Sequence, residues 1–294
     1  MTKRGSFRGE LEAFIFRTIT GLFGPLYRIG LELRILCIRQ KIRNRGSIDI
    51  SLSSQRTESS ETKATNEFRV VIISDTHCHH RHAGTLPHGD LLIHCGDVLL
   101  RSHEDIGAGE ALKDFNAWLG EQSHPHKIVI AGNHDHYLQE MGVSAVRRNL
   151  TNAIYLENEL WTSPAGLTVY GTPYSVTNGG NSPNIAFQPQ DEQAALDTVN
   201  SIPKCDILVT HGPPLGKGDD GTRGIFGCEH LERRVRSIVQ PALHCYGHVH
   251  QSFGHAIEGR TTFVNASVMD ILYAPTQPTV LFTLAKVDKC WVGK

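Results

Sequence analysis

Groups that bind metal ions follow five short apolar runs of the sequence. In chain order they are Asp75-Thr76-His77, Gly96-Asp97, Gly132-Asn133-His134-Asp135, Thr210-His211-Gly212 and Gly247-His248-Val249-His250. Imidazole nitrogens combined with carboxylate and amide oxygens favour manganese, iron or zinc over a magnesium site made of oxygens alone. A single triplet of this kind arises easily by chance in a chain with 17 histidines. Five in succession, each at the end of its own apolar run, indicate a metal centre.

This mixture of ligands is suited to a pair of divalent cations. Two cations roughly 4 Å apart can hold the attacking and the leaving oxygen of a phosphoryl displacement. Such a pair needs a carboxylate that reaches both ions, and Asp97 is the candidate for it. We therefore expect two divalent transition metal ions, Mn, Fe or Zn, as cofactors.

The elements that must position these groups are short apolar strands separated by helical patterns. Strands are predicted at residues 69–74, 91–95, 127–131, 167–170, 206–210 and 243–246, followed by 252–258, 261–265 and 280–285. Helices are predicted at residues 109–121, 137–149, 191–200 and 228–239. Alternating strands and helices indicate an α/β fold, and the helix-poor end of the chain indicates a second sheet packed against the first, between helices. Ligands of such sheets gather beyond the carboxyl ends of the strands, where all five groups lie.

The composition divides the chain into three parts. Residues 1–45 form a basic amphipathic N-terminal arm, residues 46–67 a flexible linker rich in Ser and Thr, and residues 68–294 the catalytic domain. The formal charge of −1 gives no general attraction to polyanions, so no specific nucleic acid binding is expected. Seven cysteines, odd in number and without a C-x-x-C pair, favour a reducing compartment. We predict a cytoplasmic protein, and the sequence leaves its oligomeric state open.

The N-terminal arm contains an apolar segment, residues 11–38, that is interrupted by charges. Its longest uncharged run is too short for a membrane span, which needs about 20 residues. Two interpretations stay open: short amphipathic helices that bind peripherally at a membrane interface, or a helical arm packed on the catalytic domain. Mitochondrial targeting is a weaker alternative, disfavoured by Glu10 and Glu12.

The five motifs resemble those of the calcineurin-like metallophosphoesterase superfamily, whose pattern is D-x-H, G-D, G-N-H-[DE], H and G-H-x-H in that order. The segments HCGD, KIVIAGNH, VTHGPPLG and NAS are similar to the small metallophosphoesterase-domain proteins of animal brain, a branch also found in fungi. The resemblance covers about Phe68 to Ala285. It implies a four-layer α/β/β/α sandwich of two mixed sheets.

The same resemblance implies a ligand set and a mechanism. It assigns one metal to Asp75, His77, Asp97 and His250, and the other to Asp97, Asn133, His211 and His248. A metal-bound hydroxide would attack phosphorus in line with the leaving oxygen. His134, next to a ligand but assigned to neither metal, is the candidate general acid for the leaving group. Asp135 would either orient His134 or cap the helix that begins near Tyr137.

The resemblance to the brain-type branch implies that the substrate is a small phosphodiester, such as a cyclic nucleotide. Protein phosphatases of the superfamily extend the second motif as G-D-x-x-D-R-G, whereas this chain reads Gly96-Asp97-Val98-Leu99-Leu100-Arg101. This departure weakens a claim to protein phosphatase activity, and no substrate-binding residue is assigned. The alternatives are a phosphomonoesterase that uses the same site and a catalytically weak nucleotide-binding or scaffold protein. All seven ligand positions are filled, which favours turnover.

Overall fold

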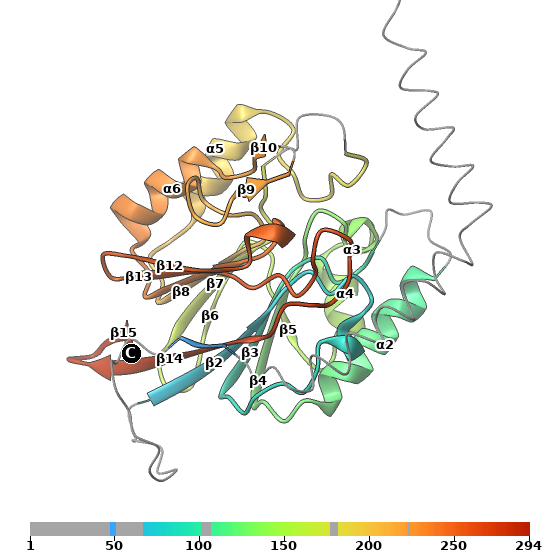
Figure 1. Ribbon diagram of the computed structural model, residues 1–294, viewed down its shortest axis with the longest axis horizontal. Coiled ribbons are helices and arrows are strands. Elements are labelled where there is room, and N and C mark those ends of the chain that lie inside the picture. Colours follow the sequence, from blue (N-terminus) through green and yellow to red (C-terminus); the bar gives the residue numbers. More distant parts are fainter. Residues whose placement is uncertain (1–47, 51–66, 101–106, 177–181, 223) are drawn as a thin grey trace, which may run out of the picture. The chain divides into compact units, whose positions relative to one another are not determined.

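The computed structural model (Figure 1) describes residues 48–50, 67–100, 107–176, 182–222 and 224–294, which all belong to the unit Arg45–Lys294. The predicted arm of residues 1–45, with its segment 11–38, lies outside these residues and stays a prediction. Residues 51–66 of the predicted linker lie outside them too. None of the helices within the described ranges is both long enough and apolar enough to cross a membrane.

One sheet carries the first three motifs. Its strand order is β1 (Ile48–Ile50), β14 (Val280–Val287), β2 (Glu67–Ile73), β3 (Leu91–Cys95), β4 (His126–Ile130) and β5 (Ile154–Tyr155), with β15 (Cys290–Gly293) paired to β14. Strands β2, β3, β4 and β5 run parallel, while β14 is antiparallel to β2. The motifs therefore leave neighbouring parallel strands at the same edge of this sheet.

A second sheet carries the last two motifs. Its order is β12 (Gly254–Glu258), β13 (Thr261–Asn265), β11 (Leu243–Tyr246), β8 (Ile207–Thr210), β7 (Thr168–Thr172) and β6 (Glu159–Thr162). The four inner strands are parallel, and β12 and β6 are antiparallel edges. A two-stranded hairpin of β9 (Asp220–Gly221) and β10 (Gly224–Ile225) follows β8.

The alternation of apolar side chains along the strands produces the layers. In β2, Val70 and Ile72 enter a core shared by the two sheets, whereas Val71 and Ile73 face a core shared with helices. Strand β8 alternates in the same way between the shared core and the helices of the second sheet. Successive side chains of a strand point to opposite faces, so each sheet is buried on both faces.

Helices cover the outer face of each sheet, as Figure 1 shows. Those on the first sheet are α2 (Ala108–Glu121), α3 (His136–Met141) and α4 (Val143–Asn149). Those on the second sheet are α5 (Glu192–Ser201), α6 (Glu229–Arg234) and a π-helical turn at Val235–Val239. Two short 3-10 turns, His80–His82 and His250–Ser252, lie in loops. The predicted α/β/β/α sandwich of two mixed sheets is confirmed.

The structure differs from the sequence-based expectation in several places. The helix predicted at residues 137–149 is two helices, because Gly142 with φ 72° ends α3 and begins α4. The end of the chain does not form one sheet, since β12 and β13 join the second sheet while β14 returns to the first. Within the predicted linker 46–67, Ile48–Ile50 form strand β1 beside β14, Ile50 is buried, and Glu67 begins β2, which corrects the prediction for these four residues.

Candidate metal centre

Strained turns follow the strands that carry the motifs. Asp75, His77, Asp97 and His248 have φ values of 55°, 43°, 54° and 68°, in the left-handed region that residues other than glycine rarely adopt. Each such conformation costs on the order of 1 kcal/mol and persists only where its surroundings hold it. These turns direct the side chains of both sheets into one cluster.

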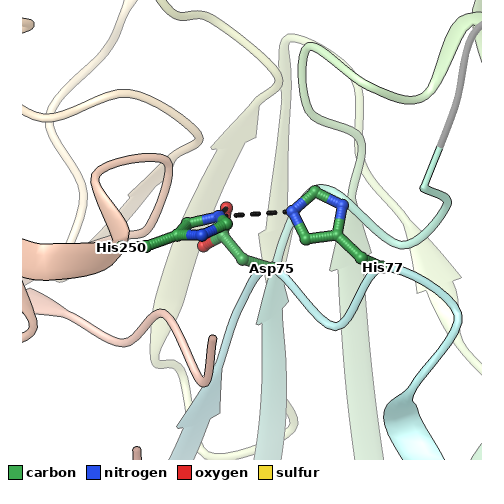
Figure 2. Close-up of side chains that lie close together, drawn as sticks. All are labelled: Asp75, His77 and His250. Carbon is green, nitrogen blue, oxygen red and sulfur yellow. Dashed lines mark hydrogen bonds and ion pairs between the residues drawn. The ribbon is translucent and has the colours of Figure 1, made fainter. Parts of the chain in front are cut away.

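The first group of potential ligands is Asp75, His77 and His250 (Figure 2). Asp75 and His77 follow β2 of the first sheet, whereas His250 follows β11 of the second. His77 Nε2 lies 3.3 Å from His250 Nε2, which in turn lies 3.5 Å from Asp75 Oδ1. The donor atoms of the group all lie within 4.8 Å of one another, so a single cation can contact all three.

The second group is Asp97, His211 and His248, with Asn133 between the two rings. His211 Nε2 lies 3.3 Å from Asp97 Oδ2. Asn133 Oδ1 lies 2.9 Å from His211 Nε2 and 2.9 Å from His248 Nδ1. Two nitrogens and two oxygens from four different turns therefore converge here, as the sequence motifs predict.

Asp97 joins the two groups. Its Oδ2 atom lies 3.7 Å from His77 Nε2 in the first group and 3.3 Å from His211 Nε2 in the second. Its Oδ1 atom accepts the backbone N–H of His134 at 2.8 Å, which fixes the rotation of the carboxylate. The side chain is almost completely buried. The seven residues singled out as ligands thus form one connected cluster with Asp97 at its centre.

Backbone carbonyls orient three of the four histidines in this cluster. Nδ1–H is donated by His77 to Leu99 O at 3.0 Å, by His211 to Cys95 O at 3.0 Å and by His250 to Asp270 O at 3.1 Å. A carbonyl oxygen only accepts, so Nδ1 carries the hydrogen and Nε2 faces the cluster. His248 is the exception, because its Nδ1 faces Asn133. Histidines that bind metals are oriented in this way, so the residues fit a pair of transition metal ions.

Hydrogen bonds also orient the oxygen atoms of the candidate ligands. The backbone N–H of His248 donates to both carboxylate oxygens of Asp75 at 3.0 Å. The side-chain amide of Asn133 donates to the carbonyl of Asn184 at 2.9 Å, which turns its oxygen toward the two histidines. Asn184 was not predicted as a site residue, because it lies in a loop and belongs to no motif.

Two glycines of the motifs make room for the carboxylates. A Cβ atom on Gly132 would overlap the carboxylate of Asp97, and one on Gly247 would overlap that of Asp75. Any side chain at these positions would push a ligand out of the cluster. The structure therefore explains both glycines by close packing against ligands.

Burial and ion pairing oppose each other in the titration of the cluster. Burial disfavours a charged ring at His77 and His248 and lowers the pKa of each to about 3. At His211, burial also lowers the pKa, but the Asp97 carboxylate outweighs it and raises the pKa to about 9. Burial raises the pKa of Asp75 and Asp97, yet nearby histidines bring both below the ordinary value. The cluster thus favours a positive charge between Asp97 and His211, as expected of a cation site.

Comparison with known proteins agrees with this geometry. The model of the family described as "Calcineurin-like phosphoesterase" matches residues 68–252, which include all seven residues of the cluster. The chain belongs to this family.

Two relatives place this calcineurin-like phosphoesterase near the animal branch that its motifs resemble. Human metallophosphoesterase domain-containing protein 1 is 36% identical over 241 residues, which cover 74% of this chain and 71% of the human protein. A UPF0046 protein of Caenorhabditis elegans is 37% identical over 240 residues, which cover 74% of this chain and 82% of the worm protein. A solved structure with 17% identity and a TM-score of 0.53, covering 74% of this chain and 95% of that one, supports the fold.

His134 lies beside the cluster of this phosphoesterase. Its Nδ1–H donates to the carbonyl of Leu100 at 2.8 Å, and its Nε2 lies 3.2 Å from Asn184 Nδ2 and 4.0 Å from Asp97 Oδ2. His134 is therefore oriented toward the bridging carboxylate without belonging to the seven predicted ligands.

Neither role suggested for Asp135 is observed. Its carboxylate accepts backbone N–H groups of Gly132 at 2.8 Å, Leu99 at 2.8 Å and Val98 at 3.2 Å, and it makes no capping hydrogen bond to α3. Burial, together with repulsion from Asp97, raises the pKa of Asp135 to about 7. Asp135 thus connects the turn after β3 with the turn after β4, and so fixes the positions of Asp97 and Asn133 relative to each other.

Proposed function

We propose that the protein is a dinuclear-metal-dependent phosphodiesterase. Asp75, His77 and His250 would hold one cation, Asn133, His211 and His248 the other, and Asp97 both. Bound at these residues, the cations would supply an activated water and neutralise the non-bridging phosphate oxygens. The observation that supports this most strongly is the position of Asp97 Oδ2, which faces a histidine of each group at 3.7 and 3.3 Å.

His134 is the proposed general acid. Its Nδ1–H is engaged with Leu100 O, so the proton for the leaving oxygen would be carried on Nε2. Asn184 Nδ2, 3.2 Å from this nitrogen, donates to it only while the ring is neutral, so the amide must turn away when Nε2 carries the proton. The Leu100 hydrogen bond is made in both protonation states, so it keeps the ring oriented when the substrate's leaving oxygen arrives.

The charge of the site supports a diester over a monoester. In the part of the chain that the structure describes, the ion-pair partners of Asp75 and Asp97 are histidines, with no lysine or arginine. A phosphomonoester is largely dianionic at neutral pH and gains more from fixed basic side chains than a monoanionic diester does. The absence of the G-D-x-x-D-R-G extension points the same way.

Hydrolysis of two related esters tests the proposal. The purified protein, loaded with Mn²⁺, is assayed on bis-p-nitrophenyl phosphate and on p-nitrophenyl phosphate. We expect kcat/KM for the diester to exceed that for the monoester by about tenfold or more, which is 1.4 kcal/mol of transition-state binding. Removal of the metal by chelation should abolish both activities.

The matched variants are Asp97→Asn and Asp197→Asn. The first removes the bridging charge with almost no change of shape and should lower diester hydrolysis at least 100-fold. The second changes an exposed carboxylate of α5 and should leave the rate unchanged. A higher kcat/KM for the monoester would instead identify a phosphomonoesterase, and full activity of Asp97→Asn would refute the dinuclear site.

A further inference from the structure

Exposed apolar side chains lie on the loops around the cluster. In the described ranges, Ile185, Ile225, Ile271 and Leu272 are among the most exposed large apolar residues, at 50%, 60%, 55% and 49%. Ile185 lies between Asn184 and Ala186, which both contact Asn133. Apolar groups exposed next to a polar site indicate a ligand with an apolar part.

Tyr273 follows the exposed Ile271 and Leu272 and contacts two histidines of the cluster. Its ring centroid lies 4.9 Å from that of His77 and 4.9 Å from that of His250, and 6.1 Å from that of His134. The residue is half-buried and has φ 57°, a conformation that a bulky residue rarely adopts. An aromatic ring therefore covers the side of the cluster where the first cation and the proposed general acid would act.

A tight turn fixes the backbone of Tyr273 relative to His250. One carboxylate oxygen of Asp270 accepts the N–H groups of Leu272 at 2.8 Å and Ala274 at 3.0 Å. The carbonyl of Asp270 accepts both the N–H of Tyr273 at 3.0 Å and Nδ1–H of His250 at 3.1 Å. One residue thus orients a ligand ring and holds the turn that presents Tyr273, so the aromatic surface is formed before any substrate binds.

Phe226 lies next to the other group of ligands. Its ring centroid is 5.9 Å from that of His248, and it follows the hairpin strand that carries Ile225. A Cβ atom on Gly221 would overlap the Phe226 ring, so the glycine leaves the space in which the ring packs. Each half of the cluster therefore has its own aromatic neighbour.

We propose that Tyr273 and Phe226, with the exposed Ile271 and Leu272, select diesters whose ester group is aromatic or otherwise apolar. This inference rests on the proposed phosphodiesterase activity. It specifies the chemical character of the ester group that the substrate carries on its phosphate. An aromatic group placed against such rings gains contact area and ring–ring attraction that a methyl ester lacks. The residues act on substrate selection and take no part in proton transfer.

The test compares two diesters that release the same leaving group. Phenyl p-nitrophenyl phosphate and methyl p-nitrophenyl phosphate both yield p-nitrophenolate, so only the retained ester group differs. We expect the Mn²⁺-loaded protein to favour the phenyl ester by about tenfold in kcat/KM. Tyr273→Asn removes the ring while tolerating positive φ, and should reduce this preference to about twofold, mainly through KM.

Two variants serve as controls. Tyr273→Phe retains the ring and should keep the preference. Ile257→Ser, which changes a side chain of β12 that is 50% exposed, should keep it as well. A wild-type protein without the preference would overturn the inference, and so would a Tyr273→Asn variant that keeps it or that loses activity equally on both diesters.

A last variant separates substrate selection from membrane docking. The double variant Ile271→Ser/Leu272→Ser should lower the preference for the phenyl ester and leave binding to phosphatidylcholine vesicles unchanged. Weaker vesicle binding with an unchanged preference would overturn the inference in favour of a lipid surface. If neither diester is hydrolysed, the proposed activity itself fails and this inference fails with it, whereas hydrolysis without discrimination refutes the inference alone.

Discussion

The proposed role of His134 as general acid depends on where its Nε2 atom points. Like the three carbonyl-bound rings of the candidate ligands, His134 points its Nε2 atom into the cluster, 4.0 Å from Asp97 Oδ2 and next to Asn184. A general acid matters in proportion to how poor the leaving group is, because a weakly acidic alcohol cannot depart as an anion. A metal ligand, in contrast, affects all substrates alike.

Replacing His134 with Asn separates these roles. We expect His134→Asn to lower kcat roughly 100-fold for a diester with an alkoxide leaving group, and much less for one that releases p-nitrophenolate. The metal content should stay at the wild-type value. Equal losses on both diesters together with loss of metal would show that His134 is a ligand.

Single residues also show which parts of the site can be predicted from the sequence. The types and spacing of Asp75, His77 and His211 are sufficient to predict them as ligands. The groups that orient them are not predictable in this way, because a backbone carbonyl such as that of Asp270 is present at every residue and becomes specific only through the turn that presents it. Asn184 could not be predicted for the same reason.

At the scale of elements, the predicted strands place the motifs correctly. Strands β3, β11 and β13 have the predicted bounds, and each consists of four or five residues that are all buried. Two-residue strands such as β5 and β9 show no periodicity and were not predicted. The break at Gly142 has a local cause, because glycine adopts φ > 0 readily, whereas the left-handed turns are tertiary effects, since local propensity alone disfavours φ > 0 at residues such as Asp97.

Buried histidines in β3 and β11 link these strands to the pH dependence of stability. His94 and His244 are fully buried, and burial lowers the pKa of each to about 3. Their Nε2 atoms lie 2.9 Å from the hydroxyl groups of Thr76 and Thr210, which belong to the motif turns. An unfolded chain has histidine pKa values near 6.5. Between pH 6.5 and 3 the unfolded chain therefore binds more protons, and stability falls as the pH falls.

The variant His244→Gln tests this linkage. Gln cannot be protonated and still offers a hydrogen-bonding amide. Below pH 6 the free energy of unfolding of the variant should therefore fall less steeply than that of the wild type, by about 1.4 kcal/mol per pH unit. Urea denaturation of the metal-free proteins between pH 6.5 and 4.5 provides the slopes. Identical slopes for wild type and variant would mean that His244 is not kept neutral by burial.

At the scale of the whole molecule, the cluster forms where two sheets meet. The first sheet supplies Asp75, His77, Asp97 and Asn133, while the second supplies His211, His248 and His250. Two hydrogen bonds connect the sheets directly. The backbone N–H of His248 donates to the Asp75 carboxylate, and Nδ1–H of His211 donates to the carbonyl of Cys95. The order of strands was not predicted, because nothing local in the sequence indicates that β14 returns to pair with β2.

The number of metal ions bound per chain tests this account most directly. The protein is saturated with Mn²⁺, desalted and analysed by inductively coupled plasma mass spectrometry, in parallel with Asp97→Asn and the control Asp197→Asn. We predict two ions per chain for the wild type and the control, and one or none for Asp97→Asn, because its amide cannot supply a shared negative charge. A wild-type protein that binds no metal, or an Asp97→Asn variant that retains two ions, would contradict the account.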